Sequence, residues 1–356
     1  MYEMADQSWR TQPRAMSPQI AELTARRIGE HASAHGLREV TLILHGGEPL
    51  LAGRELISQL VTSARRWARP TTTVHAVAQT NGVRLSDAYL KLFDELGVRV
   101  GVSVDGDASA HDRHRRFASG QGSYQAVAAA LRRLRRFPHL YGGLLCTVDL
   151  RNDPVRTYRA LADFGPPRID FLLPHGTWDQ PPPERTSDTA SAPYAAWLIE
   201  VFDHWYPKPT TGIRLFEEIM HLLLGGASDS EIVGLAPARM VVIETDGSVE
   251  QEDTLKVAYA GATATGLHVA RDELDAALSL PQIAARQIGA RALSRQCRVC
   301  PVRAICGGGL YSHRYRAGTG FLNPSVYCPD LLALISHIRD RVQADLAARR
   351  ISRAAG

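Results

Sequence analysis

The stretch EVTLILHGGEPL, which runs from Glu39 to Leu50, indicates the fold class of this 356-residue chain. Residues 39–44 form a short apolar run, as expected for a buried strand. The pair Gly46–Gly47 follows, and glycine lets the chain turn sharply and lets a ligand approach the backbone. A helical pattern then extends from Arg54 to Trp67. A strand, a glycine turn and a helix together predict one unit of an α/β sheet.

Four more strand patterns alternate with helical patterns on either side of this stretch. The predicted strands are Thr73–Val77, Val98–Val104, Gly143–Val148 and Ile169–Leu173. The predicted helices are Pro18–His35, Ser86–Leu96, Tyr124–Arg136 and Val155–Phe164, with Ser17 and Ser123 as N-caps of the first and third. Strands joined by helical crossovers run parallel, so we predict a parallel α/β sheet whose ligands bind at the carboxyl ends of its strands.

Glycines and polar residues follow the first three predicted strands where each strand ends. They are Gly46–Gly47–Glu48, Gln79–Thr80–Asn81–Gly82 and Ser103–Val104–Asp105–Gly106. Exposed carbonyl groups together with Glu48 suit a cationic amine. A glycine pair alone equally fits a plain turn between strand and helix. Three polar strand ends that face one cavity are what a ligand site in an α/β protein requires.

The second half of the chain departs from this alternation. Pro181–Pro183 and the Ser/Thr-rich residues up to Ser191 predict a linker. Later elements are predicted as helices over Tyr194–Trp205, Leu215–Leu224, Glu273–Ile288 and Leu331–Arg349, with a hairpin over Val241–Glu250 that turns at Asp246–Gly247.

Four of the five cysteines lie near the C-terminus in a spacing typical of metal ligands. The spacing is Cys297-x2-Cys300-x5-Cys306, followed by Cys328. Four thiolates can hold a 4Fe–4S cluster or a tetrahedral zinc ion, and the spacing leaves both open. The three glycines 307–309 let the backbone pass close to an inorganic core and point amides at the sulfurs. The fifth cysteine, Cys146, lies in a predicted strand and is interpreted as a core residue.

Composition and charge exclude some classes of function. The formal net charge is only +4, and basic runs such as Arg132–Arg133 fall on a helical pattern, so we predict no nucleic-acid partner. No apolar run approaches the roughly 18–20 residues that a membrane span needs. The first residues lack the apolar core of a signal peptide. We therefore expect a cytoplasmic chain without a membrane partner.

These motifs resemble those of radical-SAM enzymes over nearly the whole chain. Residues 46–49 resemble the glycine-rich motif that holds the amino group of SAM, and the tail resembles the SPASM domain, which carries auxiliary 4Fe–4S clusters. The other strand-end motifs and His111–Asp112-x-His114–Arg115 are similar to peptide-modifying members. The runs Tyr2–Trp9, Phe171–His175 and Gly307–Tyr311 resemble the FxsB-type maturases of ribosomal peptides.

The resemblance implies a fold, cofactors and partners. The fold would be α/β: a partial (β/α)6 TIM-like barrel missing its first strand over 1–180, a linker and helices over 181–236, and a SPASM domain over 237–356. The cofactors would be S-adenosyl-L-methionine and one auxiliary 4Fe–4S cluster. The partners would be a ribosomal precursor peptide and an electron donor such as ferredoxin or flavodoxin. A 5′-deoxyadenosyl radical would abstract hydrogen from the peptide, and a carbon–carbon (cyclophane) crosslink would form.

The resemblance also implies roles for individual residues. Gly46, Gly47 and Glu48 would hold the methionine part of SAM. Ser103 and Asp105 would lie near its ribose. Gln79 and Asn81 would line the opening of the same site. The ligands of the auxiliary cluster would be Cys297, Cys300, Cys306 and Cys328. Asp253 matches a proton acceptor of related sulfatase maturases, although an exposed acid beside a hairpin is the simpler interpretation.

Two features depart from the family pattern. The defining C-x3-C-x2-C triplet is absent, and it should precede Tyr2. We therefore expect an N-terminally incomplete chain that is inactive as written, with an unpaired edge at the strand 39–44. In Gly247-x4-Glu252, glutamate stands where a fuller SPASM domain has cysteine, so one auxiliary cluster is the most that the sequence supports.

Three other functions stay open at this point. One is a non-catalytic peptide-binding iron–sulfur protein, and another is a zinc-binding α/β protein. The third is an enzyme that forms formylglycine, as sulfatase maturases do. Within the family, the pattern of Phe171–His175 favours crosslinking.

Overall fold

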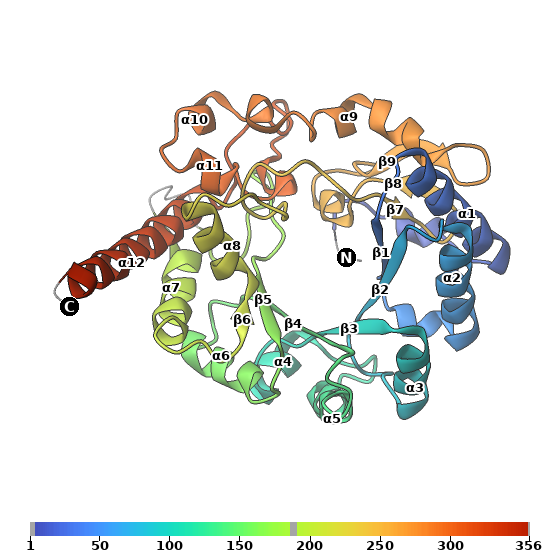
Figure 1. Cartoon of the computed structure of the whole chain (residues 1–356), viewed down its shortest axis with the longest axis horizontal. Helices are drawn as coiled ribbons and strands as arrows, with labels where there is room; N and C mark the ends of the chain where they lie inside the picture. The colour runs from blue at the N-terminus through green and yellow to red at the C-terminus, as the bar shows by residue number, and fades with distance from the viewer. Residues whose placement is uncertain (1–3, 186–190, 355–356) are drawn as a thin grey trace. The chain divides into compact units, whose positions relative to one another are not determined.

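The computed structural model describes residues 4–185 and 191–354, which cluster into two compact units (Figure 1). Unit 1 comprises residues up to 146 together with 160–169 and 239–284. Unit 2 comprises residues 147–159, 170–238 and those from 285 onward. Part of the predicted linker, residues 186–190, and the first two residues of the run Tyr2–Trp9 lie outside the described residues.

The main sheet follows the predicted order of strands. Its strands are β1 (Glu39–Leu44), β2 (Thr73–Thr80), β3 (Val98–Ser103), β4 (Tyr141–Thr147), β5 (Arg168–Leu172) and β6 (Gly212–Ile213), in the order β1-β2-β3-β4-β5-β6. β1 to β4 pair in parallel, with Leu44 opposite Ala78 and Thr80 opposite Val102. The parallel register places the carboxyl ends of the first three strands at one edge. β6, which has two residues, was not predicted.

Several helices belong to unit 1. They are α1 (Pro18–Ala34), α2 (Arg54–Trp67), α3 (Asp87–Leu96), α4 (Ala108–His114), α5 (Tyr124–Leu134) and α9 (Pro281–Ala284), while α6 (Pro154–Ala162) is shared by both units. α1 begins as predicted, because the Ser17 hydroxyl accepts a hydrogen bond from the Ile20 amide and proline occupies the first turn.

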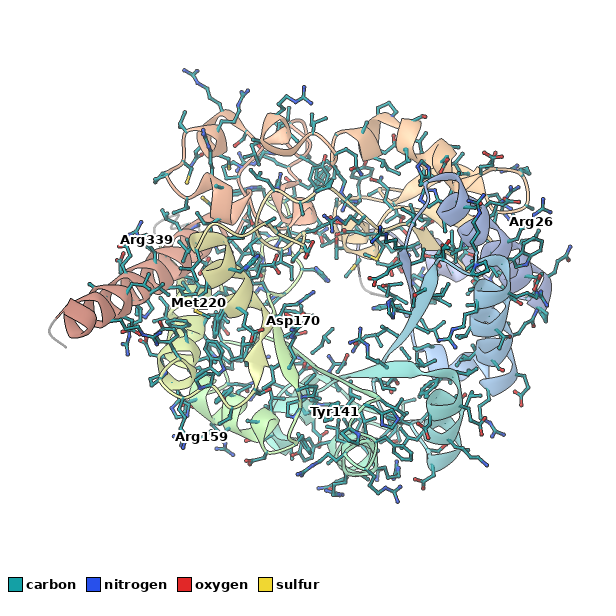
Figure 2. All side chains as sticks on the ribbon, viewed as in Figure 1. Arg26, Tyr141, Arg159, Asp170, Met220 and Arg339 are labelled. Atoms are coloured by element: carbon teal, nitrogen blue, oxygen red, sulfur yellow. The ribbon has the colours of Figure 1, made fainter. Side chains whose placement is uncertain are left out.

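Close approach between α1 and α2 depends on Gly29. A Cβ atom at this position would lie 2.5 Å from the carbonyl oxygen of Trp67, so only glycine fits. Behind the sheet, Val61, Leu90 and Phe93 are fully buried. Burying a side chain of this size contributes roughly 1.5–3 kcal/mol, so these contacts hold the helices on the sheet. The outer face of α1 carries the exposed Arg26 (Figure 2).

A small antiparallel sheet also belongs to unit 1. β7 (Val242–Ile243) pairs with β8 (Ser248–Glu250), and β8 pairs with β9 (Ala264–His268). The predicted hairpin with its turn at Asp246–Gly247 is confirmed, because Gly247 has a φ of 96° and the Ser248 amide donates to the Asp246 carboxylate. The third strand was not predicted.

Unit 2 is built around three helices. They are α7 (Pro193–Trp205), α8 (Arg214–Leu223) and α12 (Cys328–Ala354), accompanied by the short α10 (Arg295–Arg298) and α11 (Arg303–Cys306). Asp330, in the first turn of α12, accepts hydrogen bonds from the amides of Tyr194 and Ala195 at the start of α7. A carboxylate at a helix N-terminus is stabilised by the helix dipole, and Arg185 pairs with the same carboxylate.

Two sequence predictions about helices are wrong. The continuous helix over Glu273–Ile288 is instead a 3₁₀ turn, η4 (Leu274–Ser279), followed by the short α9, because Pro281 cannot continue a preceding helix. Ser123 occupies the N-cap position of α5, but its side chain makes no capping bond. Among the described residues, no helix is both long enough and apolar enough to cross a membrane.

Candidate ligand site and candidate metal centre

The Glu48 carboxylate joins the first two strand ends. Its Oε1 accepts hydrogen bonds from the Leu50 amide at 3.0 Å and the Thr80 hydroxyl at 2.7 Å. Its Oε2 accepts from the Asn81 amide at 2.8 Å. A carboxylate offers about four lone-pair sites, so three protein donors leave room for roughly one more. The motif after β1 and the motif after β2 therefore meet at one pre-oriented carboxylate.

A second side-chain bond connects β2 with β3. The Gln79 side-chain amide donates to the Ser103 hydroxyl at 3.0 Å. Gly101 makes room for this glutamine, since a Cβ atom there would lie 2.3 Å from Gln79 Oε1. All three strand ends are thus linked by side chains that the sequence singled out. Gly46 and Gly47 are exposed beside them, and Gly46 has a φ of 54°.

The Asp105 carboxylate, which follows β3, is paired with an arginine. Arg115, just beyond α4, donates to it through two nitrogens, Nε to Oδ2 at 2.5 Å and a terminal nitrogen to Oδ1 at 3.2 Å. Such two-point pairs are strong and fix orientation. A ribose hydroxyl that bound Asp105 would therefore use carboxylate lone pairs that the guanidinium leaves available.

A buried histidine orders the loop around this pair. The Asp105 amide donates to His111 Nδ1 at 3.3 Å, and His111 Nε2 lies 3.0 Å from the Ser123 hydroxyl. Because that hydroxyl donates to the Arg115 carbonyl, it accepts from Nε2, which fixes His111 as the neutral Nε2-protonated tautomer. Burial and the nearby Arg115 lower the pKa of His111. This role also explains why Ser123 does not cap α5.

A cavity of about 380 Å³ opens beside these strand ends. Of the residues predicted for SAM, Glu48 and Asn81 line it, together with Arg115, whereas Gly46, Gly47, Gln79, Ser103 and Asp105 are not among its lining residues. The other lining residues are Leu51, Val83, Arg84, His114, Arg116, Phe117 and Ser123. Its volume falls in the range of small-molecule sites. One carboxylate and several arginines suit a ligand that carries both charges.

The four C-terminal cysteines come together in unit 2. Cys297 lies in α10, Cys306 ends α11, and Cys328 begins α12. Burial raises the pKa of the Cys306 thiol to about 12, and the charges of Cys328 and Cys297 add to the rise. The pKa of Cys328 is raised by burial and then by Cys297 and Cys300. All five cysteines are free of disulfides, and Cys146 is buried in β4 as predicted.

The spacing of the thiols bears on the choice of metal. Among the described residues, only two groups bring three or more ligand atoms within 4.8 Å of one another, and the cysteines form neither. A closed tetrahedral zinc site, with Zn–S bonds of about 2.3 Å, needs sulfurs only about 3.8 Å apart. No three of the thiols are thus drawn together as they would be in a closed zinc site, and four thiolates are also the ligand set of a 4Fe–4S core.

The glycine loop after Cys306 fits a buried inorganic core. Gly307 has a φ of 60°, and a Cβ atom on it would lie 1.5 Å from the Gly234 carbonyl oxygen, so no side chain is possible. The Gly308 amide donates to the Cys306 sulfur. This is the amide-to-sulfur contact that the glycine run predicted.

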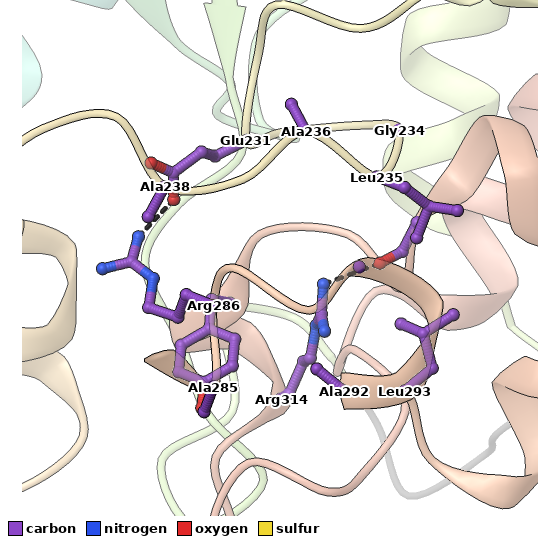
Figure 3. A pocket seen from close by; sticks show the side chains of 13 residues that line it. Glu231, Gly234, Leu235, Ala236, Ala238, Ala285, Arg286, Ala292, Leu293 and Arg314 are labelled. Atoms are coloured by element: carbon purple, nitrogen blue, oxygen red, sulfur yellow. Dashed lines mark hydrogen bonds and ion pairs between the residues drawn. The ribbon is translucent and has the colours of Figure 1, made fainter. Parts of the chain in front are cut away.

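Arg314 holds the loop in place and was missed by sequence reasoning. Its buried guanidinium donates to the carbonyl groups of Gly307 and Gly309, both at 2.7 Å, and of Gly308 at 3.1 Å. Figure 3 shows Arg314 among the side chains that line a pocket in unit 2, with the Arg286–Glu231 ion pair nearby. Three adjacent glycine carbonyls in a buried loop each need a hydrogen-bond donor, and this need is the signal that could have pointed to a nearby arginine.

Asp253 lies at the start of a 3₁₀ turn, η3 (Asp253–Val257), just after β8. Its Oδ1 is 3.1 Å from the Lys256 ammonium, which also pairs with Glu244 and lies 3.6 Å from Glu250. Burial alone would lower the pKa of Lys256, but Asp253 and Glu244 raise it above its usual value. Asp253 is thus one of three carboxylates around a buried ammonium, rather than an isolated surface acid.

Known proteins resemble this chain in sequence and in structure. No family model matches it. The serine-type anaerobic sulfatase-maturating enzyme of Klebsiella aerogenes is 25% identical over 304 residues, which is 83% of this chain and 72% of that enzyme. A cysteine-type anaerobic sulfatase-maturating enzyme of Clostridium perfringens is 26% identical over 242 residues, 66% of this chain and 64% of that enzyme.

Solved structures agree with these similarities. The structure of anSMEcpe with bound AdoMet and a peptide superposes with a TM-score of 0.78 at 20% identity, covering 94% of this chain and 92% of that one. SuiB of Streptococcus suis, bound to its precursor peptide SuiA, gives 0.53 at 13% identity over 86% of this chain and 69% of SuiB. The chain therefore has the radical-SAM/SPASM fold, which confirms the predicted α/β class.

Proposed function

We propose that this chain is a radical-SAM maturase that binds S-adenosyl-L-methionine at the carboxyl ends of β1 to β3 and modifies a ribosomally made peptide. The observation that carries the proposal is the Glu48 carboxylate, which holds two strand ends together beside the cavity. The similar enzymes and the AdoMet-bound structure of the same fold support it.

The residues at the strand ends fit the two charges of the methionine part. The exposed carbonyl groups of Gly46 and Gly47 and the unused lone pair of Glu48 would receive its ammonium group. An arginine of the cavity wall, Arg84 or Arg116, would face its carboxylate. When bound, SAM supplies the 5′-deoxyadenosyl radical; this chain's own residues bind it, orient it and shield it from water.

We further propose one auxiliary 4Fe–4S cluster on Cys297, Cys300, Cys306 and Cys328. The four cysteines without disulfides and the Gly308 amide beside the Cys306 sulfur support this cluster. The 356 residues contain no C-x3-C-x2-C triplet, so they hold no ligands for the cluster that reduces SAM. We therefore expect the chain as written to bind its cofactors without starting the reaction. An external electron donor such as ferredoxin or flavodoxin would serve the complete system.

SAM binding is the direct test. Glu48→Gln keeps the size of the side chain but removes its charge and places an amide donor against the Asn81 amide. We expect at least a tenfold weaker SAM affinity, measured anaerobically by calorimetry, since tenfold corresponds to about 1.4 kcal/mol. Glu55→Gln, an exposed acid in the first turn of α2, is the matched control and should bind normally. Equal affinities in the two variants would contradict the proposed SAM site.

The chemical outcome on the peptide is proposed as a carbon–carbon crosslink, by the resemblance of Phe171–His175. Formylglycine formation is the second candidate, favoured by the sulfatase-maturating relatives. A crosslink and the oxidation of serine both remove two hydrogens, so mass alone does not separate them. An aldehyde-reactive hydrazide labels only formylglycine. The assay therefore uses the chain fused at residue 1 to a segment that carries a C-x3-C-x2-C triplet, and the 356-residue chain alone should form no 5′-deoxyadenosine in the same assay.

A further inference from the structure

Two histidines lie on one face of α1, away from the strand ends. His31 and His35 are four residues apart, so they are neighbours on the helix surface, and their ring centroids are 4.7 Å apart. Asp275 in η4 approaches them from a position 244 residues after His31. All three residues belong to unit 1.

Both rings point at the same carboxylate. His31 Nδ1 pairs with Asp275 Oδ1, and His35 Nε2 lies 2.9 Å from Oδ2. The three ligand atoms lie within 4.8 Å of one another. The side chains are 29%, 44% and 38% exposed, so an ion can reach them from solvent.

This set has the donors that zinc prefers. Two imidazoles and one carboxylate bind Zn²⁺ at about 2.0–2.2 Å, and water takes the fourth position. Each histidine nitrogen already lies within hydrogen-bonding distance of the carboxylate, and ligands of a tetrahedral centre lie roughly 3.4 Å apart, so a small outward shift of these exposed side chains admits the ion.

The other compact group of possible ligands in the described chain does not offer a comparable site. It consists of Glu244, Glu250 and Asp253, where the Lys256 ammonium already sits among the three carboxylates. Arg27, one helical turn before His31, is engaged by Glu30 and by the Val269 carbonyl. A metal ion at the histidines therefore does not have to displace a lysine ammonium, as it would among the three carboxylates.

We propose that His31, His35 and Asp275 form a zinc site on the surface of unit 1 that ties α1 to η4. Neutral imidazoles and an ionised carboxylate bind the ion, and an imidazole that is protonated before binding releases its proton to solvent. Because the ion binds the folded unit more tightly than the unfolded chain, zinc raises the free energy of unfolding with the logarithm of its concentration above Kd. The site is independent of the proposed function.

The test counts zinc by difference. The full chain and the variant His31→Ala/His35→Ala are titrated with Zn²⁺ under identical conditions, so any zinc bound by the thiols cancels. We expect one fewer zinc ion per chain in the double variant and loss of the zinc-dependent rise in Tm. His139→Ala, which removes an exposed histidine paired with Asp94, is the control. This variant should keep the full zinc stoichiometry and the zinc-dependent rise in Tm.

Asp275→Asn is a second test that remains informative if the double variant does not fold. It preserves the shape of the carboxylate but not its charge, and we expect a zinc affinity at least tenfold lower with an unchanged Tm in the absence of zinc. Equal zinc stoichiometry in the chain and the double variant would overturn the proposal. So would equal zinc affinity in the chain and the Asp275→Asn variant.

Discussion

The strand ends of unit 1 and the cysteine tail of unit 2 handle charge in opposite ways. At the strand ends, the carboxylates of Glu48 and Asp105 already have protein donors, namely amides, a hydroxyl and a guanidinium. In the tail, burial and mutual repulsion raise the pKa of Cys306 and Cys328, so their thiolate forms are disfavoured until a cation arrives. The first region is therefore organised without its ligand, whereas the second depends on one.

The sharpest way to break this comparison is to remove a thiol. Cys306→Ala should lower the iron content after anaerobic reconstitution below about four atoms per chain, because one iron of a 4Fe–4S cluster loses its thiolate ligand. Cys146→Ala, which removes a buried thiol from β4, is the control, and this variant should have the same iron content as the unaltered chain. Iron and sulfide analysis with absorbance near 400 nm measures the effect. A full cluster in the Cys306 variant would contradict the assignment of this ligand.

A smaller effect is expected at the strand ends, where the protein itself supplies the partner. Arg115→Met leaves Asp105 largely buried without its guanidinium. Breaking a buried pair costs 3–5 kcal/mol, and because Arg115 is partly exposed we expect a loss of about 2 kcal/mol in the free energy of unfolding. Arg116→Met, which changes an exposed neighbour, should cost much less. Urea unfolding of both variants gives the comparison, and equal losses would show that the pair does not hold this loop.

The smallest effect tests whether the three hydrogen-bond donors to the Glu48 carboxylate each contribute to stability. Thr80→Val removes one of three donors to the carboxylate, while the Leu50 and Asn81 amides stay in place. The same hydroxyl accepts from the Gly82 amide at 3.0 Å, so two hydrogen bonds of about 1 kcal/mol each are lost, and the added methyl group of valine offsets part of this. We expect a net loss of about 1–1.5 kcal/mol. Thr73→Val, an exposed position on the same strand, is the matched control. A much larger loss at Thr80 would mean that the strand end is held by this hydroxyl alone.

The sequence predicted those parts of the molecule that depend on neighbouring residues. Alternating apolar runs located β1 to β5 to within a few residues, because strand and helix periodicities are local. Three of the four cysteine positions fall within ten residues, so their spacing was informative. The helix over Glu273–Ile288 was wrong because Pro281 outweighed the apolar pattern. β6, with only two residues, exists through its neighbour in the sheet and carries no pattern of its own.

Partners that are distant in sequence were not predictable. Nothing local indicates that Glu48 binds the Thr80 hydroxyl, 32 residues away, or that Arg115 pairs with Asp105. The choice of Ser123 as a cap failed for the same reason, since His111 and the Arg115 carbonyl compete for its hydroxyl. The spacing of cysteines also leaves the metal open, because it does not give the distances between sulfurs.

The first turn of α12 contains both a proposed metal ligand and the residue that anchors α7. Cys328 opens the helix, and two residues later Asp330 holds the start of α7 through the Tyr194 and Ala195 amides. Helical geometry fixes the distance between the two residues, so a displacement of the thiol is passed to the anchor of α7. Binding of the proposed cluster would therefore bear on the position of α7, a helix more than 120 residues upstream in the chain and in the same unit.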